Sequence, residues 1–307
     1  MRVIRWVTET ELFGAFGYAR GIGAIDQTLS RGFDPAQDNK RIILDFSHGH
    51  GLVMPSEEGK FAGLKFVTVA PGNRDQNLPR IQGVYTLLDS ATLSPLAQCD
   101  GAALTLLRTS CVTTATLSKI GTKSSPRVFV FGSGPQALAH ILALSEISTP
   151  REVYVRARNV ERVGLFLEEL TSRGFTARVG SDKDLAISDV VILATTARQP
   201  LLSPSQLKKD AVVAAVGSHE SDARELPGEL FADSQVFVED IDVALREAGD
   251  VIMAIDEGYI TREGLVEMRA LFSGGAHPTL HSRRVYKSVG MPWQDLSVFG
   301  AAYEFLS

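Results

Sequence analysis

The sequence has little cysteine and no long apolar run, and both absences narrow the class of protein. Cys99 and Cys111 are the only cysteines in 307 residues, so no disulfide framework is expected. Arg5 and Glu9 interrupt the start of the chain where a signal peptide would need an apolar core, and no segment approaches the length of a membrane span. We therefore expect a cytoplasmic protein in a reducing compartment, with no membrane as partner.

The chain also lacks any concentration of charge of one sign. The formal net charge is −5 and no block of like charges stands out, so a nucleic acid is not an expected partner. His48 and His50 lie in a glycine-rich segment with no third ligand in view, so no metal site is predicted. Apolar residues make up 44% and charged residues 22%, which is typical of globular proteins, and the length favours two domains.

The clearest break in the sequence pattern is GTKSSP at residues 121–126. Gly121 can close a helix as its C′ residue, and Pro126 prevents that helix from resuming. After the break, short strands rich in Val, Ile and Ala alternate with helical patterns, which predicts a parallel sheet buried on both faces. The expected strands are 127–132, 152–157, FTARV, 189–196, DAVVAAVG and QVFVED, and the expected helices are 135–147 and 159–172.

Residues 1–120 have a different pattern, typical of a mixed sheet with flanking helices. Strands are expected at 42–46, 64–70 and 84–89, with turns at HGHG and PGN. The segment GAALTLLRTSCVTTATLS predicts a buried helix, and a last helix around 292–306 follows Pro292 and is a candidate to fold back onto this part of the chain. The predicted fold class is thus α/β, with a Rossmann-type domain and a second domain.

A dinucleotide fingerprint follows the first of the parallel strands. In VFVFGSGPQA, the first glycine makes a tight turn, the second lets the backbone approach a pyrophosphate, and the small third residue lets helix and strand pack closely. The strand before it and the helix after it are the context that supports the motif, and the alternative is a structural glycine-rich turn of another α/β fold. The predicted cofactor-binding residues here are Gly132, Ser133, Gly134, Pro135, Gln136 and Ala137.

The end of the second parallel strand bears on the choice of cofactor. A carboxylate there would bind the ribose of NAD, whereas VYVRARN places Arg156 and Arg158 there, and an arginine accepts a 2′-phosphate. The pattern favours NADP(H), with NAD(H) possible, and the alternative is a pair of surface arginines. Thr195 and Thr196 are expected at a strand end beside the cofactor, or simply as the end of a threonine-rich strand.

Three cations in the first part of the chain stand where charge is costly. Lys65 lies in LKFVTV, where both faces of the strand are largely apolar, so we expect it to be half-buried and suited to donating a proton or anchoring a substrate, unless it snorkels to water. Arg108 is the only charged residue between Asp100 and Lys119, and needs an anion from the protein or a substrate. Arg41 alone says little, since an arginine at the start of a strand is usually solvated.

Several segments, taken in order, carry a resemblance to a known family. They are KFVTVAPGN, LPRIQG, CDGAALTLLRTSCVTTA, VFGSGPQALAH, VGSHESDARELP and YKSVGMPWQDL. From about residue 41 to the C-terminus, the chain resembles the ornithine cyclodeaminase/μ-crystallin family. The resemblance implies a homodimer, a substrate-binding and dimerisation domain of α+β type built from residues 1–120 with 285–307, a Rossmann domain over 121–284, and a site between the domains.

The resemblance also assigns roles to individual residues. The family's substrate-carboxylate arginines fall on Arg41 and Arg108, its active-site lysine on Lys65, and the aspartate of its QD pair, which we expect to contact the cofactor, on Asp295. One departure is His219, which stands where ornithine cyclodeaminase has the aspartate that handles the distal amine. Reductase-like and crystallin-like members also lack that aspartate, so the resemblance favours them over a strict ornithine cyclodeaminase.

These observations lead to one hypothesis and two alternatives. The hypothesis is an NAD(P)H-dependent reductase of a cyclic ketimine acid or an open-chain imine of a 2-oxo acid, reversible as an amino-acid dehydrogenase. His219 is then a substrate-binding candidate, able to titrate near neutrality, or merely a hydrogen-bonded loop residue. The alternatives are a cyclodeaminase-type lyase that recycles NAD internally, and a crystallin-like protein that binds the dinucleotide without catalysis.

Overall fold

The computed structural model describes residues 4–76 and 78–307, and it divides into two compact units. Unit 1 comprises Met1–Val112 and Met291–Ser307, and unit 2 comprises Thr113–Gly290. The first unit therefore joins both ends of the chain, and one boundary lies within helix α2 (Gly101–Lys119).

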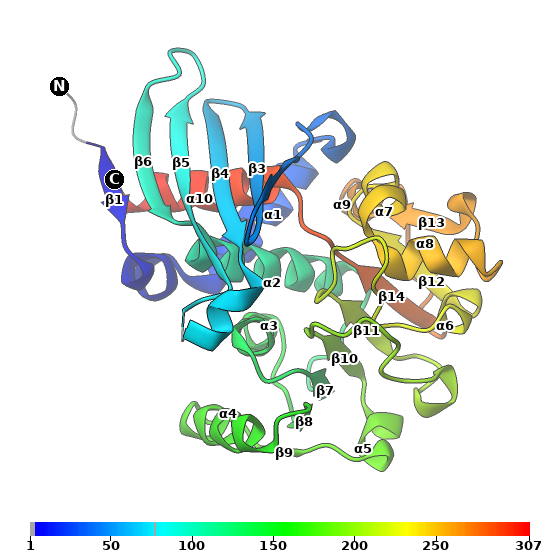
Figure 1. Cartoon of the computed structure of the whole chain (residues 1–307). Helices are drawn as coiled ribbons and strands as arrows, with labels where there is room; N and C mark the ends of the chain where they lie inside the picture. Colours follow the sequence, from blue (N-terminus) through cyan, green and yellow to red (C-terminus); the bar gives the residue numbers. More distant parts are fainter. Residues whose placement is uncertain (1–3, 77) are drawn as a thin grey trace. The chain divides into compact units, whose positions relative to one another are not determined.

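Unit 1 is built on a mixed sheet, as its sequence pattern predicts. Among the described residues its strand order is β1-β6-β5-β4-β3-β2, with β1 parallel to β6 and the other neighbours antiparallel (Figure 1). The strands are β1 (Arg5–Val7), β2 (Ile42–Phe46), β3 (Gly49–Glu58), β4 (Phe61–Val69), β5 (Ile81–Asp89) and β6 (Pro95–Asp100). The other helical segments of this unit are η1 (Glu11–Phe16), α1 (Gly17–Ser30), η2 (Pro35–Gln37), η3 (Pro71–Gln76) and α10 (Pro292–Leu306).

The expected turn at HGHG is only partly right. The turn is confined to Ser47 and His48, and β3 already begins at Gly49. A two-residue turn is sufficient to join antiparallel strands. Gly49 is needed there because a Cβ at this position would lie 2.1 Å from the carbonyl oxygen of Val69. The sequence of β3 lacks a clear alternation of apolar and polar residues, which is why pattern alone misses it.

Helix α10 covers one face of this sheet, as its sequence position suggested. It begins with Pro292 at its first position, which suits a residue that has no backbone N–H. The helix contacts α1 and the strands β3, β4 and β5 (Figure 1). Gly63 of β4 lies under it, where an added Cβ would meet the Tyr85 ring and Leu296. The C-terminal segment is therefore brought onto the strand that carries Lys65.

Unit 2 contains the predicted parallel sheet, which confirms the Rossmann-type expectation. Among the described residues its order is β13-β12-β14-β11-β10-β7-β8-β9, and every neighbouring pair is parallel. The strands are β7 (Arg127–Phe131), β8 (Glu152–Arg156), β9 (Ala177–Val179), β10 (Val190–Leu193), β11 (Val212–Ala215), β12 (Ser234–Val238), β13 (Leu265–Glu267) and β14 (Arg283–Lys287).

The helices of unit 2 follow these strands in alternation. They are α3 (Pro135–Ser145), α4 (Val160–Ser172), α5 (Asp182–Ile187), η4 (Pro204–Gln206), α6 (Glu229–Ala232), α7 (Ile241–Glu247), α8 (Gly249–Asp256), η5 (Arg262–Gly264) and α9 (Met268–Phe272). Helix α2 ends just before the sheet begins, and Gly121 follows it with a φ of 91°, as predicted for a C′ glycine.

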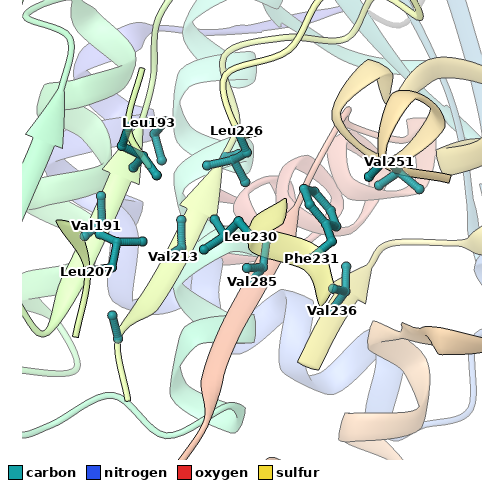
Figure 2. Packing of buried hydrophobic residues seen from close by; sticks show 14 of the residues in the cluster. Val191, Leu193, Leu207, Val213, Leu226, Leu230, Phe231, Val236, Val251 and Val285 are labelled. Carbon is teal, nitrogen blue, oxygen red and sulfur yellow. The ribbon is translucent and has the colours of Figure 1, made fainter. Parts of the chain in front are cut away.

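The core of unit 2 is formed by the buried faces of its central strands (Figure 2). Val191, Val213 and Val285, from β10, β11 and β14, are almost fully buried, and Leu230 and Phe231 of α6 pack against them. Each such side chain contributes about 1.5–3 kcal/mol relative to an exposed position. This packing holds the three strands rigidly, so the loops that follow their carboxyl ends start from well-defined positions.

Because all strands of this sheet are parallel, their carboxyl ends lie at one edge. The chain runs from β7 outward through β8 and β9, then returns to β10 on the other side of β7. The neighbouring strands β7 and β10 thus form the switch point where such sheets bind ligands. No helix within the described residues has the length and apolar character needed to cross a membrane.

Candidate active site

The glycine-rich turn after β7 has the backbone geometry that a dinucleotide requires. Gly132 has a φ of 117°, and a Cβ there would lie 2.5 Å from the carbonyl oxygen of Ala194. Gly134 precedes helix α3, and a Cβ at this position would meet nothing within 4 Å. Ala137 is fully buried in the first turn of the helix. The free N-terminal N–H groups of α3 and the bare backbone at Gly134 therefore fit a pyrophosphate.

The two arginines after the second parallel strand have different environments. Arg156 donates to Asp182 at 2.9 Å and lies over the rings of Phe129 and Phe131, with 5.1 and 5.7 Å between its guanidinium carbon and the ring centroids. Arg158 is exposed, and no ion pair of its side chain is found among the described residues. Of the two predicted cofactor residues, Arg156 is already engaged by the protein and Arg158 is available.

Next to Arg158, the chain begins helix α4. Asn159 caps this helix, since its side chain accepts a hydrogen bond from the backbone N–H of Arg162 at 2.9 Å. Arg158 is therefore adjacent to the positive end of a helix dipole, where an anion is stabilised. Its predicted role with a 2′-phosphate is consistent with this position and stays a prediction.

Thr195 and Thr196 lie beyond the end of β10, which stops at Leu193 rather than extending to residue 196. The strand ends early because the backbone N–H of Thr195 donates to the Glu225 carboxylate instead of to a strand neighbour. The Thr195 hydroxyl also donates to Glu225, at 2.7 Å. Thr196 is exposed. A cofactor contact of either threonine stays a prediction.

In unit 1, the structure brings Lys65 and Asp295 together. The Lys65 Nζ lies 2.7 Å from Asp295 Oδ2 and donates to the Thr105 hydroxyl at 3.2 Å. The expectation of a half-buried lysine is wrong, because only 1% of its surface is exposed. Helix α10 covers the face of β4 that carries Lys65, which the strand's own sequence cannot reveal.

The pKa of Lys65 is lowered to about 7, mainly by burial; the positive charges of Arg108 and Arg41 also lower it, whereas Asp295 raises it. The influence of Arg41 and Arg108 on this pKa indicates that the three predicted cations lie near one another. A lysine with a pKa near neutrality can both donate and accept a proton under ordinary conditions.

Arg108 is the second buried cation of this site. Its Nε lies 3.4 Å from Asp295 Oδ1, and a terminal nitrogen donates to the Gln294 side chain at 2.7 Å. The protein therefore supplies an anion for Arg108, and Asp295 serves both cations. The sequence resemblance predicts that Asp295 contacts the cofactor. Its observed partners are Lys65 and Arg108, and the cofactor contact stays a prediction.

Asp38 is a residue of this region that the sequence analysis missed. Its carboxylate accepts from the Ser56 hydroxyl at 2.7 Å and from the backbone N–H of Trp293 at 2.8 Å. Helix α10 has no side-chain cap of its own, so Asp38 satisfies one of its first free N–H groups. Burial raises the pKa of Asp38 to about 6. No signal in the AQDNK segment distinguishes it from a surface aspartate.

His219 is half-buried in the loop after β11. The buried residues Glu225, Asp250 and Lys287 lie near that loop. Sequence analysis also missed them, because each follows other charged residues in the chain and therefore resembles a surface position. Among the described residues, no group of three or more His, Cys, Asp and Glu side chains could hold a metal ion.

Residues 18–307 match the model of the ornithine cyclodeaminase/mu-crystallin family. The chain belongs to this family. One family relative is a Delta(1)-pyrroline-2-carboxylate reductase of Bacillus cereus, which is 32% identical over 262 residues, or 82% of this chain and 80% of the relative. The predicted family membership is thus confirmed.

Two solved structures share the fold over nearly the whole chain. The Thermococcus litoralis Delta(1)-pyrroline-2-carboxylate reductase, in complex with NADH and L-proline, superposes with a TM-score of 0.91 at 24% identity and covers 98% of this chain and 97% of its own. An archaeal alanine dehydrogenase dimer with bound NAD has a TM-score of 0.89 at 23% identity, covering 98% and 95%. At this identity the two structures confirm the fold.

Proposed function

We propose that this chain is a nicotinamide-dependent reductase of an imine of a 2-oxo acid, working reversibly as an amino-acid dehydrogenase. The observation that carries the proposal is the buried Lys65–Asp295–Arg108 cluster, in a chain that also has a dinucleotide-binding turn. The oxidoreductase class, acting on CH–NH groups with NAD(P), follows from the family and its relatives.

The arginines bind the carboxylate that every 2-imino acid carries. Arg108 is held by Gln294 and Asp295, so its guanidinium is oriented before the substrate arrives. Arg41 is half-buried and adds a second positive charge. A carboxylate held by two such groups leaves its imine carbon in one orientation, which is the main contribution a protein makes to hydride transfer.

Lys65 handles the proton in this mechanism. When bound, the cofactor supplies the hydride that reduces the C=N carbon. The Lys65 ammonium donates a proton to the imine nitrogen as the C=N carbon receives the hydride. In the reverse direction, the neutral Lys65 amine takes that proton back from the amino nitrogen of the substrate as the hydride leaves. Asp295 keeps the lysine in place and favours its charged form, so the two residues act as one unit.

The substrate proposed is a cyclic ketimine acid such as pyrroline- or piperideine-2-carboxylate, or an open-chain imino acid. The B. cereus relative is named for the first of these, and the archaeal neighbour is an alanine dehydrogenase, whose oxidation product is an open-chain imine. His219 stands where a lyase of this family has an aspartate that binds a distal amine. The proposal therefore favours a substrate without that amine, and His219 is proposed to contact a polar group on the side chain of the substrate.

For the cofactor, we propose that NADPH is preferred over NADH. Arg158 is exposed beside the start of helix α4, where a 2′-phosphate would gain from both the guanidinium and the helix dipole. The two solved structures contain NADH or NAD, so the proposed preference rests on the residues of this chain alone. We assign Arg156 no part in this preference, because Asp182 already pairs with it.

A second copy of the chain is the proposed partner of unit 1. One face of its sheet is covered by α10, and the other exposes a set of large apolar side chains that the strand register places on the same side. An exposed apolar face of this kind marks an interface, and the archaeal neighbour is a dimer. The exposed residues are Trp6, Ile42, Leu44, Phe46 and Leu64.

The test of the proposed function is a spectrophotometric assay. Purified protein is mixed with NADPH or NADH and a panel of cyclic imino acids, and of 2-oxo acids with ammonia or methylamine. Loss of the reduced nicotinamide band is the expected result, faster with NADPH. Formation of proline and ammonia from ornithine without net oxidation would overturn the proposal in favour of a lyase. Binding of the dinucleotide with no reaction of either kind would favour a non-catalytic protein.

A further inference from the structure

Lys287 is a buried lysine of unit 2 that the proposed mechanism does not use. It is the last residue of β14, and 1% of its surface is exposed. Its Nζ lies 2.8 Å from Asp250 Oδ2 and donates to the backbone carbonyl of Ser218 at 2.7 Å. Lys287 thus links the buried Asp250 carboxylate of α8 to Ser218, which lies in the loop after β11, one residue before His219.

The Asp250 carboxylate is connected to a second buried carboxylate, that of Glu225, through the Glu225 backbone. Asp250 Oδ1 accepts from the backbone N–H groups of Glu225 and Leu226 at 2.7 and 2.8 Å. The Glu225 side chain in turn accepts from Gly217 N–H at 2.7 Å and from the backbone and hydroxyl of Thr195 at 2.9 and 2.7 Å. One continuous set of buried contacts therefore fixes the chain just after β10 and just after β11.

These loops are also packed tightly against each other. A Cβ on Gly217 would lie 2.2 Å from the carbonyl oxygen of Thr195 and 2.5 Å from a Glu225 carboxylate oxygen. Glu225 is buried completely, so each of its hydrogen bonds is made away from water. Neither loop can move without leaving a buried charged group unpaired, which is costly.

Stability alone does not account for this arrangement. Three ionisable side chains are removed from water, and well-packed apolar residues are often at least as stable as a buried ion pair. The charged contacts instead hold each of the two loops in one conformation at the carboxyl edge of the sheet. In a Rossmann sheet the half that carries the fingerprint binds one mononucleotide and the other half binds the second. Strands β10, β11 and β14 form that other half here.

We propose that Lys287, Asp250 and Glu225 are positioning residues that hold the Thr195 and Gly217–His219 loops for the nicotinamide end of the cofactor. They act through these loops and touch neither cofactor nor substrate. The inference rests on the proposed function, in that the ligand is a nicotinamide dinucleotide. The inference goes beyond the proposed function because it assigns to a buried network the task of orienting the nicotinamide ring.

Arg284 provides a matched control on the same strand. It is also a buried cation, 4% exposed, and donates to the backbone carbonyls of Ile120 at 2.9 Å and of Gly121 at 3.3 Å. It lies at the amino end of β14, whereas Lys287 lies at the carboxyl end. Replacing Arg284 removes a buried charge and its contacts from this sheet without releasing either loop.

The experiment compares Lys287→Met, Glu225→Gln and Arg284→Met in the full chain. Two quantities are measured for each: the dissociation constant of NADPH by calorimetry, and the emission of the reduced nicotinamide in the bound complex. We expect the first two variants to bind NADPH within about threefold of wild type and to lose at least half of the emission enhancement, because the ring is no longer held. Their kcat should fall at least tenfold, and Arg284→Met should match wild type in all three.

Equal emission and equal kcat in both network variants would overturn the inference, and so would an equal loss of emission in Arg284→Met. If Lys287→Met does not fold, Glu225→Gln carries the test, because glutamine has the same shape and cannot accept from both Gly217 and Thr195. The emission measurement needs no turnover, so a wild-type protein that binds NADPH but reduces no imine would contradict the proposed function and still test the network.

Discussion

The ammonium of Lys65 lies 2.7 Å from the carboxylate of Asp295, and both side chains are buried. The two residues are 230 positions apart in the chain and meet because helix α10 packs on strand β4. A buried ion pair with one proton to exchange, beside two arginines that can hold a carboxylate, is well suited to reducing an imino acid.

Replacing Lys65 by alanine should abolish turnover and leave the dinucleotide bound. The expected loss is at least about a thousandfold, because the proton donor is removed and Asp295 keeps a buried charge with one partner fewer. Steady-state kinetics and calorimetric titration with NADPH measure the two effects. Lys65→Arg is the control that retains the charge and cannot exchange a proton; a Lys65→Ala variant with wild-type rates would remove the role assigned to this residue.

The reaction should depend on pH through the pKa of Lys65, which burial lowers to about 7. Imine reduction needs the charged lysine, so its kcat/KM should fall as the pH rises through 7. Amino-acid oxidation needs the neutral lysine and should rise over the same interval. Asp295 favours the charged form, so Asp295→Asn should move both midpoints to lower pH. Profiles that keep the same midpoint in the asparagine variant would contradict the coupling of the two residues.

Arg158→Ala should raise the KM for NADPH by about tenfold, equivalent to about 1.4 kcal/mol, and change the KM for NADH little. The reason is that its guanidinium is exposed and available to a 2′-phosphate. Arg156→Ala is the matched control two residues away, since Asp182 and two aromatic rings already engage that side chain. If both variants changed the KM for NADPH and the KM for NADH equally, neither arginine would bind the 2′-phosphate.

Arg41→Ala and Arg108→Ala should each raise the KM for the imino acid by at least tenfold. The two variants should differ in stability, because Arg41 is half-buried whereas Arg108 is buried and bonded to Gln294. We expect Arg108→Ala to cost about 1–3 kcal/mol in the free energy of unfolding. Kinetics and chemical denaturation separate the two contributions, and a KM unchanged in both variants would exclude the carboxylate clamp.

Because the pKa of Asp38 is raised in the folded protein, the free energy of unfolding should fall as the pH rises from about 4 to 6. Burial raises its pKa from 3.8 to about 6, so the folded protein binds a proton there that the unfolded chain releases. Asp38→Asn can still accept from Trp293 N–H and can donate to Ser56. Relative to wild type, this variant should therefore gain stability between pH 4 and 7, by up to about 3 kcal/mol. Chemical denaturation of both proteins at pH 4 and at pH 7 measures this gain. A difference in stability between variant and wild type that is the same at both pH values would contradict the raised pKa of Asp38.

Local patterns in the sequence predicted those features that depend on neighbouring residues. The strand before Gly132 and the helix after it, the end of α2 at Gly121, and the start of α10 at Pro292 all follow from propensity and backbone geometry within a few positions. Lys65 and Arg108 were found because a charge in an apolar stretch is visible without any structure. The strand β3 was missed because glycine, proline and charged residues obscure its alternation.

The sequence by itself thus determined the alternation of strands and helices after residue 126, the glycine-rich turn and the three cations of the candidate site. Only the tertiary structure decided that Lys65 is fully buried, that Asp295 is its partner, that Arg156 is engaged while Arg158 is available, and that Lys287 reaches the loop before His219. The physical reason is the range of the forces involved. Backbone preferences act over one or two turns of chain, whereas burial and ion pairing depend on segments that packing brings together from distant positions.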